Sequence, residues 1–446
     1  MAAEKKKYLF EIAWETCNQV GGIYTVIRTK VPSMVEKWGD DYALIGPYFT
    51  QTAAAEFEPI TVTDETPLER AILNLRKAGL GVHYGYWLIT GKPKIVLFEL
   101  ETLMAEVDVI KGKIWENHKI STLGVEDLVN QTIVFGEMIR LLLTEVAEEN
   151  KNKTLLVAHF HEWMASTGLP DLKKDKVKIA TVFTTHATML GRYLAGNVPN
   201  FYEVIEHFDW LKEAKHYGIE AQACFERAAA QKADVLTTVS DITAKECQYF
   251  LGRIPELILP NGLNIQRFAA LHEHQNLHSK YKESISNFVM GHFFQSQPFD
   301  LEQTLYLFTS GRFEYSNKGY DITLDALAIL NRKMKEAGSK KTVVMFFVTK
   351  QPYHSIDPEV LHSRAVLDEI RENCYAIEKK VGELLFNASA SSSDLQMPDL
   401  NTFVDEYWRM RLRRTVQTWK TKARPKVVTH LLKQEDDIIR NLHRTN

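Results

Sequence analysis

Two pairs of side chains have the types and the spacing to bind a phosphorylated sugar. His186 and Arg192 flank one expected strand-to-helix turn, and Arg312 and Lys318 flank another. A guanidinium group can pair with a diphosphate through two hydrogen bonds, and an imidazole can bond to a sugar hydroxyl. Two cations beside a diphosphate would also stabilise the negative charge that develops as it leaves. The alternative for Arg312 and Lys318 is a pair of surface charges without a ligand.

A third candidate is the segment Gln19-Val20-Gly21-Gly22. It follows the first expected strand and enters a helix, where two glycines let the main chain approach a phosphate closely. The segment lacks both the dinucleotide fingerprint and the Lys-Ser/Thr of a P-loop, and Gly-Gly turns are common. By itself it therefore indicates only a candidate phosphate contact.

Two histidines, His159 and His161, follow another expected strand. On an extended segment both would face the same side and could hold a metal ion. No third ligand group accompanies them at a recognisable spacing, so a packed, hydrogen-bonded turn is the favoured interpretation. The sequence also shows no nucleophilic Ser or Cys beside a base, which argues against acyl transfer.

These residues need a sheet to position them, and the first 265 residues predict one. Short apolar runs alternate with helical patterns, which is typical of α/β proteins. The runs lack strict alternation, so they predict strands covered on both faces, as in a parallel sheet. The expected strands are Tyr8–Ala13, Tyr42–Ile45, Lys94–Phe98, Thr154–Ala158, Ile179–Thr184, Val235–Val239 and Leu257–Leu259. Ligands of such sheets bind beyond the carboxyl ends of the strands, where the candidate residues fall.

A second α/β series runs from Thr304 to Thr349 as strand, turn, helix and strand. This is a single β-α-β unit, too little to complete a doubly wound domain. Residues 357–420 are mostly helix-forming, with a Ser-rich run at 388–394 that predicts a flexible linker. The basic stretch Arg409–Lys426 predicts a solvated helix face or a subunit contact, with a polyanion site as the alternative.

Composition sets the broad class of the protein. With 446 residues, 45% of them hydrophobic, the chain predicts two or three globular domains rather than disorder. A net charge of -3 gives no reason to expect nucleic acid. Four widely spaced cysteines support neither a disulfide scaffold nor a zinc ribbon, which favours the reducing cytoplasm. The N-terminus shows no signal region, and no apolar stretch reaches the ~20 residues needed to cross a membrane.

In this order, the motifs resemble the glycogen synthases of the animal and fungal type, a glycosyltransferase family. The resemblance spans about residues 8–350 and is specific as a combination, although no single piece is. The segments that carry it are Phe10–Val26, Ala158–Trp163, Phe183–Tyr193, Glu226–Ala230, Thr237–Ser240, Pro260–Asn264, His272–His278 and Gly311–Gly319.

The resemblance implies a GT-B fold, in which two Rossmann-like doubly wound domains enclose UDP-glucose between them. The second domain would be incomplete here and would carry a helical insertion. It implies retaining α-1,4 transfer of glucose from UDP-glucose to the nonreducing end of glycogen. His186 would contact the donor glucose and Arg192 the donor, while Arg312 and Lys318 would stabilise the leaving diphosphate. Gln19, Gly21 and Gly22 would form the phosphate-facing turn at the substrate.

The resemblance also predicts partners and regulation. No metal, no other cofactor and no covalent enzyme nucleophile is expected. A glucose-6-phosphate site would include His272, Glu273, Gln275, His278 and Lys282. Partners would be glycogen, a glycogenin-like primer protein and further copies of the chain in a tetramer, in the cytoplasm, with neither nucleic acid nor membrane.

The same comparison gives expected domain boundaries. Residues 1–285 would form the N-terminal Rossmann-like domain and residues 286–355 the first part of the donor-nucleotide domain. Residues 356–428 would be a helical insertion for oligomerisation, and residues 429–446 would return toward the second domain.

Two departures from the family pattern leave alternatives open. Gln19 stands where the family usually has Arg or Lys, so a related synthase using ADP-glucose is one alternative. Asn446 precedes the segment that would carry paired glutamates and a Glu-Pro-Trp-Gly-like turn of the donor pocket. We therefore expect this chain alone to transfer no glucose, and a catalytically incomplete sugar-nucleotide- or glycogen-binding paralogue or fragment is the other alternative.

Overall fold

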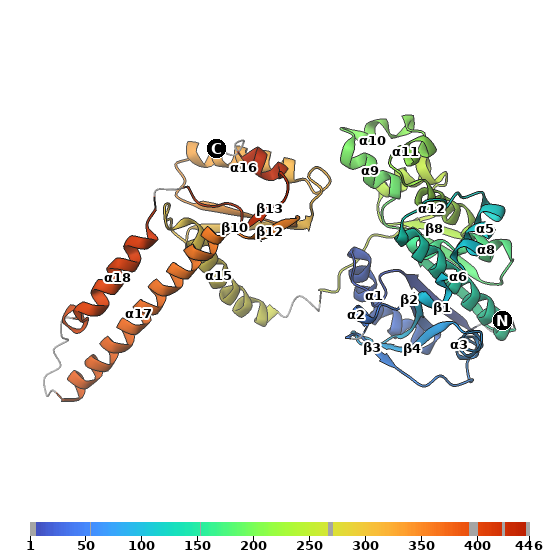
Figure 1. The fold of residues 1–446 in the computed structure, drawn as a ribbon, viewed down its shortest axis with the longest axis horizontal. Coiled ribbons are helices and arrows are strands. Elements are labelled where there is room, and N and C mark those ends of the chain that lie inside the picture. The colour runs from blue at the N-terminus through green and yellow to red at the C-terminus, as the bar shows by residue number, and fades with distance from the viewer. Residues whose placement is uncertain are drawn as a thin grey trace. The chain divides into compact units, whose positions relative to one another are not determined.

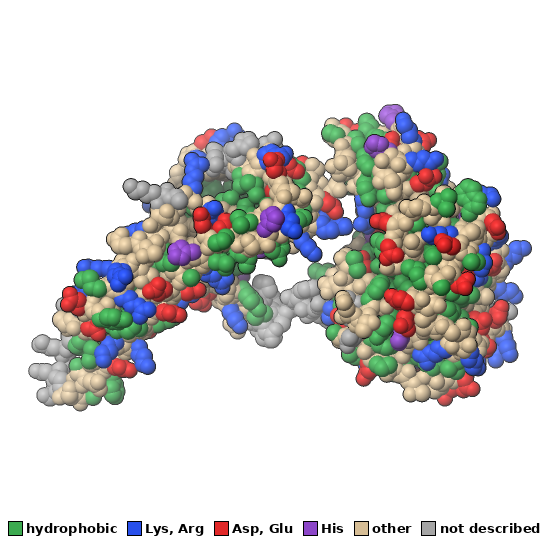
Figure 2. Space-filling model, viewed as in Figure 1, with side chains coloured by type: hydrophobic (Ala, Val, Ile, Leu, Met, Phe, Trp, Pro, Cys, Tyr) green, Lys and Arg blue, Asp and Glu red, His purple; other side chains and the backbone are tan. Residues whose placement is uncertain are grey.

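The computed structural model describes residues 6–53, 55–151, 153–265, 271–391, 400–421 and 424–442. The chain divides into two compact units, Met1–Phe268 and Ala269–Asn446. Within the described ranges, every helix is too short or too polar to span a membrane. Acidic and basic side chains are interspersed on the faces that Figure 2 shows.

The first unit is built on a nine-stranded sheet in the order β3-β4-β5-β2-β1-β6-β7-β8-β9 (Figure 1). All neighbouring strands are parallel except the pairs β3–β4 and β4–β5. The predicted α/β class with a largely parallel sheet is therefore confirmed. The strands are β1 Lys7–Ala13, β2 Tyr42–Pro47, β3 Phe57–Pro59, β4 Gly81–Trp87, β5 Lys94–Glu99, β6 Leu155–His161, β7 Ala180–Thr185, β8 Val235–Thr238 and β9 Leu257–Ile258.

Apolar residues on both faces of this sheet explain why helices cover both sides. On β1, Phe10 and Ile12 belong to one buried cluster, together with helix α6 (Asp127–Asn150). The alternate residues Leu9 and Ala13 belong to the other cluster, together with helix α1 (Gly22–Trp38). Because successive side chains of a strand point to opposite faces, this pattern requires a doubly wound layer structure.

The strand order reverses beside β1. From β1 the chain first builds β2 on one side and later returns to build β6, β7 and β8 on the other. A crevice for ligands forms at such a reversal, outside the carboxyl ends of the strands. The segments that follow β1, β6 and β7 are therefore the expected ligand-binding edge of this unit.

The second unit has a smaller framework. Strands β10 (Thr304–Arg312) and β11 (Thr342–Lys350) pair in parallel and are joined through helix α16 (Tyr320–Glu336), as predicted. A separate antiparallel pair, β12 (Tyr353–Ile356) and β13 (His430–Leu432), lies in the same unit. Its remaining α-helices are α15 Leu271–Phe293, α17 Pro358–Ser391, α18 Glu406–Trp419 and α19 Asp437–Asn441. Helices α17 and α18 lie side by side, joined by the hydrogen bond from Asn373 to Thr415 (Figure 1).

Some predicted boundaries differ from the structure. The boundary expected at residue 285 falls inside the continuous helix α15, and the contacts instead divide the chain between Phe268 and Ala269. The linker expected at 388–394 begins inside α17, which continues to Ser391, and residues 392–394 lie outside the described ranges. Strands β3 and β4 were not predicted, because glycines and exposed polar residues interrupt their apolar pattern.

Candidate active site

A chain of polar side chains lies near the carboxyl ends of β1, β6 and β7. Glu11 belongs to β1, His161 ends β6, and His186 directly follows β7. His161 Nε2 lies 2.7 Å from Glu11 Oε1, and His161 Nδ1 lies 3.2 Å from His186 Nε2. Parallel pairing of neighbouring strands thus connects three residues that are far apart in the sequence.

Glu11 is a buried carboxylate with partners on several elements. Lys30 of α1 forms an ion pair with Oε1, the Tyr42 hydroxyl donates to Oε2, and His161 binds Oε1. Burial raises the pKa of Glu11, but the charge of Lys30 and the hydrogen bond from His161 outweigh it and hold the pKa well below its usual range. Glu11 is therefore ionised, and its carboxylate oxygens accept hydrogen bonds without donating any.

The histidines around Glu11 are uncharged at neutral pH. Burial lowers the pKa of His159, of His161 and of His186, for His186 to about 3. His159 Nε2 lies 2.7 Å from the Thr184 hydroxyl oxygen and so points along the sheet. His186 can therefore act as a neutral hydrogen-bonding group toward a ligand but not as a cation.

Glu162 links the two predicted residues of this unit. Its Oε1 accepts a hydrogen bond from the His186 backbone N–H at 3.0 Å and lies 3.5 Å from Arg192 Nη2. Burial raises its pKa, and the charge of Arg192 opposes the rise. Its φ of 64° is uncommon for a residue with a side chain, and such backbone strain clusters at functional sites.

Two further buried glutamates hold the loop that carries His186. Glu226 of helix α12 (Glu220–Lys232) accepts from the Met189 N–H at 2.9 Å and bonds to the Thr185 hydroxyl at 3.1 Å. Glu246 of helix α13 (Asp241–Glu246) accepts from the N–H and the hydroxyl of Thr188. The loop between β7 and helix α9 (Met189–Asn197) is thereby fixed from both ends.

The predicted phosphate turn already has an internal anion. Glu15 Oε2 accepts from the N–H groups of Gly21 and Tyr24, at 2.9 and 2.8 Å, at the N-terminus of α1. Gln19, Gly21 and Gly22 are exposed beside it. A phosphate at this turn would have to share the helix N-terminus with Glu15 or displace it.

The second unit brings its two predicted cations together. Arg312 ends β10, is exposed, and its Nε lies 3.4 Å from Glu314 Oε1. Lys318 closes the following loop, and its Cδ would lie 3.4 Å from a Cβ added at Gly311, so its stem folds over the residue before Arg312. Both cations therefore lie at the carboxyl end of one strand, where α/β sheets bind ligands.

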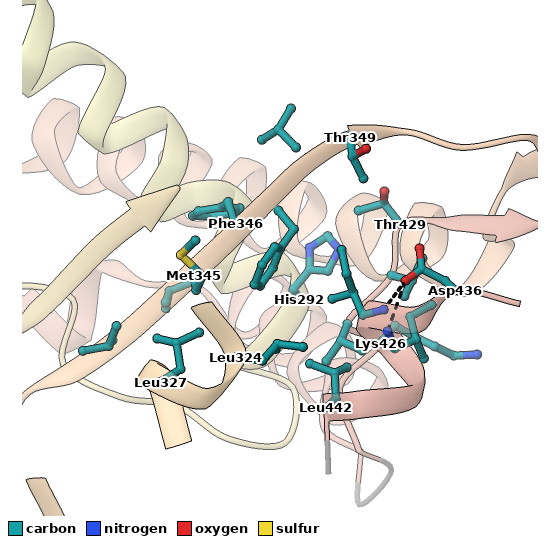
Figure 3. Close-up of a pocket in the computed structure, with 18 of the residues that line it drawn as sticks. His292, Leu324, Leu327, Met345, Phe346, Thr349, Lys426, Thr429, Asp436 and Leu442 are labelled. Carbon is teal, nitrogen blue, oxygen red and sulfur yellow. Dashed lines mark hydrogen bonds between the residues drawn. The ribbon is translucent and has the colours of Figure 1, made fainter. Parts of the chain in front are cut away.

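An apolar cavity of about 920 Å³ lies elsewhere in the second unit (Figure 3). It lies among His292 of α15, Leu324 of α16, Phe346 of β11, and Leu442 near the end of the described chain. Within the described part of the chain, neither Arg312 nor Lys318 lines it. The cavity is thus separate from the predicted diphosphate contacts.

The residues predicted for glucose-6-phosphate fall on α15. Gln275 and His278 are exposed on this helix, and Lys282 is partly buried. The side chains of His272 and Glu273 lie outside the described residues. Their role remains a prediction.

Glu11 supplies the third group that the sequence did not offer for a metal. One ligand atom each of Glu11, His159 and His161 lies within 4.8 Å of the others. Lys30, however, already forms an ion pair with Glu11, and His161 already binds it. A metal ion would have to displace both interactions.

Sequence reasoning missed the glutamates of this site, which are Glu11, Glu15, Glu162, Glu226 and Glu246. One signal could have found Glu11: it is an acidic residue inside the otherwise apolar run Tyr8–Ala13. Burying a carboxylate is costly unless partners compensate, so such a position predicts a polar network. The partners of Glu11 come from α1, β2 and β6 and could not be read from spacing.

Comparison with known proteins identifies the family. The Glycogen synthase family pattern matches residues 11–446. A glycogen [starch] synthase of Neurospora crassa is 40% identical over 99% of this chain and 62% of its own length. Those of Dictyostelium discoideum and human liver are 42% and 40% identical over 98% and 95% of this chain, and 49% and 59% of their own lengths.

The chain therefore spans about half to three fifths of the length of these relatives. Among solved structures, a trehalose 6-phosphate synthase from Burkholderia multivorans aligns over 88% of this chain and 71% of its own, at 12% identity and a TM-score of 0.39. That structural likeness is too low to carry an argument. The family match over most of the chain does carry one: this chain belongs to the glycogen synthase family.

Proposed function

We propose that the protein carrying this chain is a glycogen synthase, which transfers glucose from UDP-glucose to the nonreducing end of glycogen through an α-1,4 linkage with retention. The observation that carries the proposal is the group around Glu162. There, His186 and Arg192 share one buried carboxylate at the reversal point of a doubly wound sheet, in a chain of this family. This is where such folds bind nucleotides and sugars.

The chemistry assigned to the residues follows from their charge. His186 bonds to the donor glucose as a neutral group, and Arg192 contacts the donor. Arg312 and Lys318 stabilise the diphosphate as the bond between it and C1 of glucose breaks. A new bond forms between C1 and the acceptor hydroxyl oxygen, whose proton passes to the departing phosphate. Because these cations offset the developing charge, the proposed reaction needs no metal.

Regulation and assembly belong to the same proposal. Glucose-6-phosphate would bind near α15, through Gln275, His278, Lys282 and their neighbours. Further copies of the chain would associate through α17 and α18, whose exposed residues include Tyr375, Phe386 and Tyr407. A glycogenin-like protein would supply the primer, and the cytoplasm would supply the donor.

A labelled-donor assay on the natural protein that contains this sequence tests the proposal. Glycogen is incubated with UDP-[14C]glucose or with ADP-[14C]glucose, and precipitated label is counted. We expect incorporation from UDP-glucose. Incorporation from ADP-glucose alone would support the alternative donor that Gln19 suggests, and binding of either nucleotide without incorporation would support the non-catalytic alternative.

A further inference from the structure

The neutral ring of His186 carries one proton, and its neighbours determine which of the two nitrogens holds it. Glu11 is the starting point because its carboxylate, held by Lys30 and Tyr42, can only accept hydrogen bonds. His161 Nε2, 2.7 Å from Glu11 Oε1, must therefore carry a hydrogen. His161 is only 3% exposed and neutral, so its Nδ1 has a lone pair and no hydrogen.

His161 in turn determines the tautomer of His186. His161 Nδ1 can only accept, and its partner at 3.2 Å is His186 Nε2. His186 must therefore carry its hydrogen on Nε2, which leaves a lone pair on Nδ1. That Nδ1 is buried and has no hydrogen-bond partner among the described residues.

A buried acceptor without a partner is destabilising, so its persistence points to a ligand that supplies the missing donor. Glu162 holds the backbone of His186, and His161 Nδ1 holds its ring through Nε2. A lone pair selects a hydroxyl and disfavours phosphate or carboxylate, whose oxygens also offer lone pairs.

We propose that Glu11, acting through His161, fixes the tautomer of His186 so that Nδ1 accepts a hydrogen bond from a hydroxyl of the bound glucose. Glu11 and His161 are then positioning residues that touch no substrate. The ion pair with Lys30 keeps Glu11 in the ionised form that this relay from Glu11 through His161 to His186 requires. The identity of the sugar rests on the proposed function, whereas the tautomer does not.

Nitrogen-15 NMR of the histidine-labelled chain tests the tautomer without any activity. His161→Gln and His186→Gln variants assign the two rings. At pH 7 we expect the rings of His161 and His186 each to carry a hydrogen on Nε2 and none on Nδ1. A proton on Nδ1 of His186 would overturn the proposal.

Two variants test the coupling between the residues. Glu11→Gln replaces a carboxylate that can only accept hydrogen bonds by an amide that can also donate one. A fraction of the molecules should then carry the proton on Nδ1 of both His161 and His186. Tyr42→Phe removes a partner of Glu11 that does not touch either ring, and should leave both tautomers unchanged. If Glu11→Gln alters His161 but not His186, the relay does not exist.

Ligand addition separates this inference from the proposed function. UDP-glucose should shift the Nδ1 resonance of His186, UDP alone should not, and deoxy analogues of the sugar should identify the hydroxyl. A shift caused by maltoheptaose and not by UDP-glucose would uphold the acceptor role and contradict the donor assignment. Absence of a shift with every sugar would overturn the ligand role.

His186→Ala should weaken UDP-glucose binding at least tenfold, whereas the exposed control His207→Ala should not.

Discussion

Buried carboxylates determine the chemistry of the first unit. Glu162, Glu226 and Glu246 surround the loop from Thr185 to Met189 and supply the acceptors for its backbone and side chains. The pKa values of all three are raised, chiefly by burial. The loop is therefore preorganised by groups whose ionisation costs folding free energy.

Glu226 makes the stability of this unit dependent on pH. Burial raises its pKa to about 8, from 4.5, so between these values the folded chain binds a proton that the unfolded chain has lost. The free energy of unfolding should therefore fall as pH rises through this range, by up to about 1.4 kcal/mol per pH unit. Glu226→Gln mimics the protonated form and should remove this slope.

Urea unfolding of parent and variant at pH 5.5, 6.5 and 7.5 measures the slope. Glu220→Gln, on the same helix but partly exposed and paired with Lys215, is the matched control and should keep the parent slope. Equal slopes for the parent and Glu226→Gln would show that Glu226 is ionised when folded.

Arg312 makes a separate residue-scale prediction in the second unit. If it stabilises the leaving diphosphate, Arg312→Ala should lower kcat by about 100-fold or more, on the order of 3 kcal/mol of barrier. Arg332→Ala removes an exposed cation of α16 and serves as the control. Near-normal kcat for Arg312→Ala in the UDP-glucose assay would argue against the assigned role.

Strands and helices position the site residues, and the strands could largely be predicted from the sequence. The strand before His186 and the strand that ends at Arg312 were both expected from their apolar runs. For β7 the reason is that strands buried on both faces have few polar residues. The glutamates could not be placed, since helix α12 meets α7 (Glu162–Ser166) and Thr185 at the end of β7 only through the tertiary fold. The internal anion Glu15 was also missed, because its bonds to Gly21 and Tyr24 form only when the turn closes.

Close packing of helix α9 against Glu246 gives an element-scale prediction. A Cβ at Gly191 would lie 2.3 Å from Glu246 Oε2 and 2.6 Å from Thr188 Oγ1. Gly191→Ala should therefore push α9 away from Glu246, destabilise the chain by about 1–3 kcal/mol, and disturb the loop of His186.

A glycine in open space provides the control. Gly112 lies in helix α5 (Val107–His118), and a Cβ there meets nothing within 4 Å. Gly112→Ala should stabilise the chain by about 0.5–1 kcal/mol, because alanine loses less backbone entropy in a helix. Thermal unfolding distinguishes the two variants, and a Gly191→Ala variant as stable as the parent would contradict the packing.

On the scale of the whole molecule, the two units differ in how fully their sheets are buried. Nearly all of β1 and β2 is buried, whereas β10 and β11 form a two-stranded sheet with Phe308 76% exposed and Val348 55% exposed. Composition gave no hint of this difference, because it depends on what packs over each strand.

Amide hydrogen exchange should reveal this difference in stability between the two sheets. Amides of β1, β2 and β6 should exchange at least tenfold more slowly than those of β10 and β11, because two-stranded sheets are marginally stable. Mass spectrometry of the intact chain, after exchange and peptic digestion, measures both sets in one sample. Equal protection would show that the second unit is as stable as the first.

The product of the reaction tests the central claim most directly. The natural protein is incubated with UDP-[13C]glucose and maltoheptaose, and the anomeric signals of the product are read by NMR. We predict a new α-1,4-linked glucose at the nonreducing end, with one UDP released for each glucose transferred. A β linkage, or UDP release that yields only free glucose, would contradict the account.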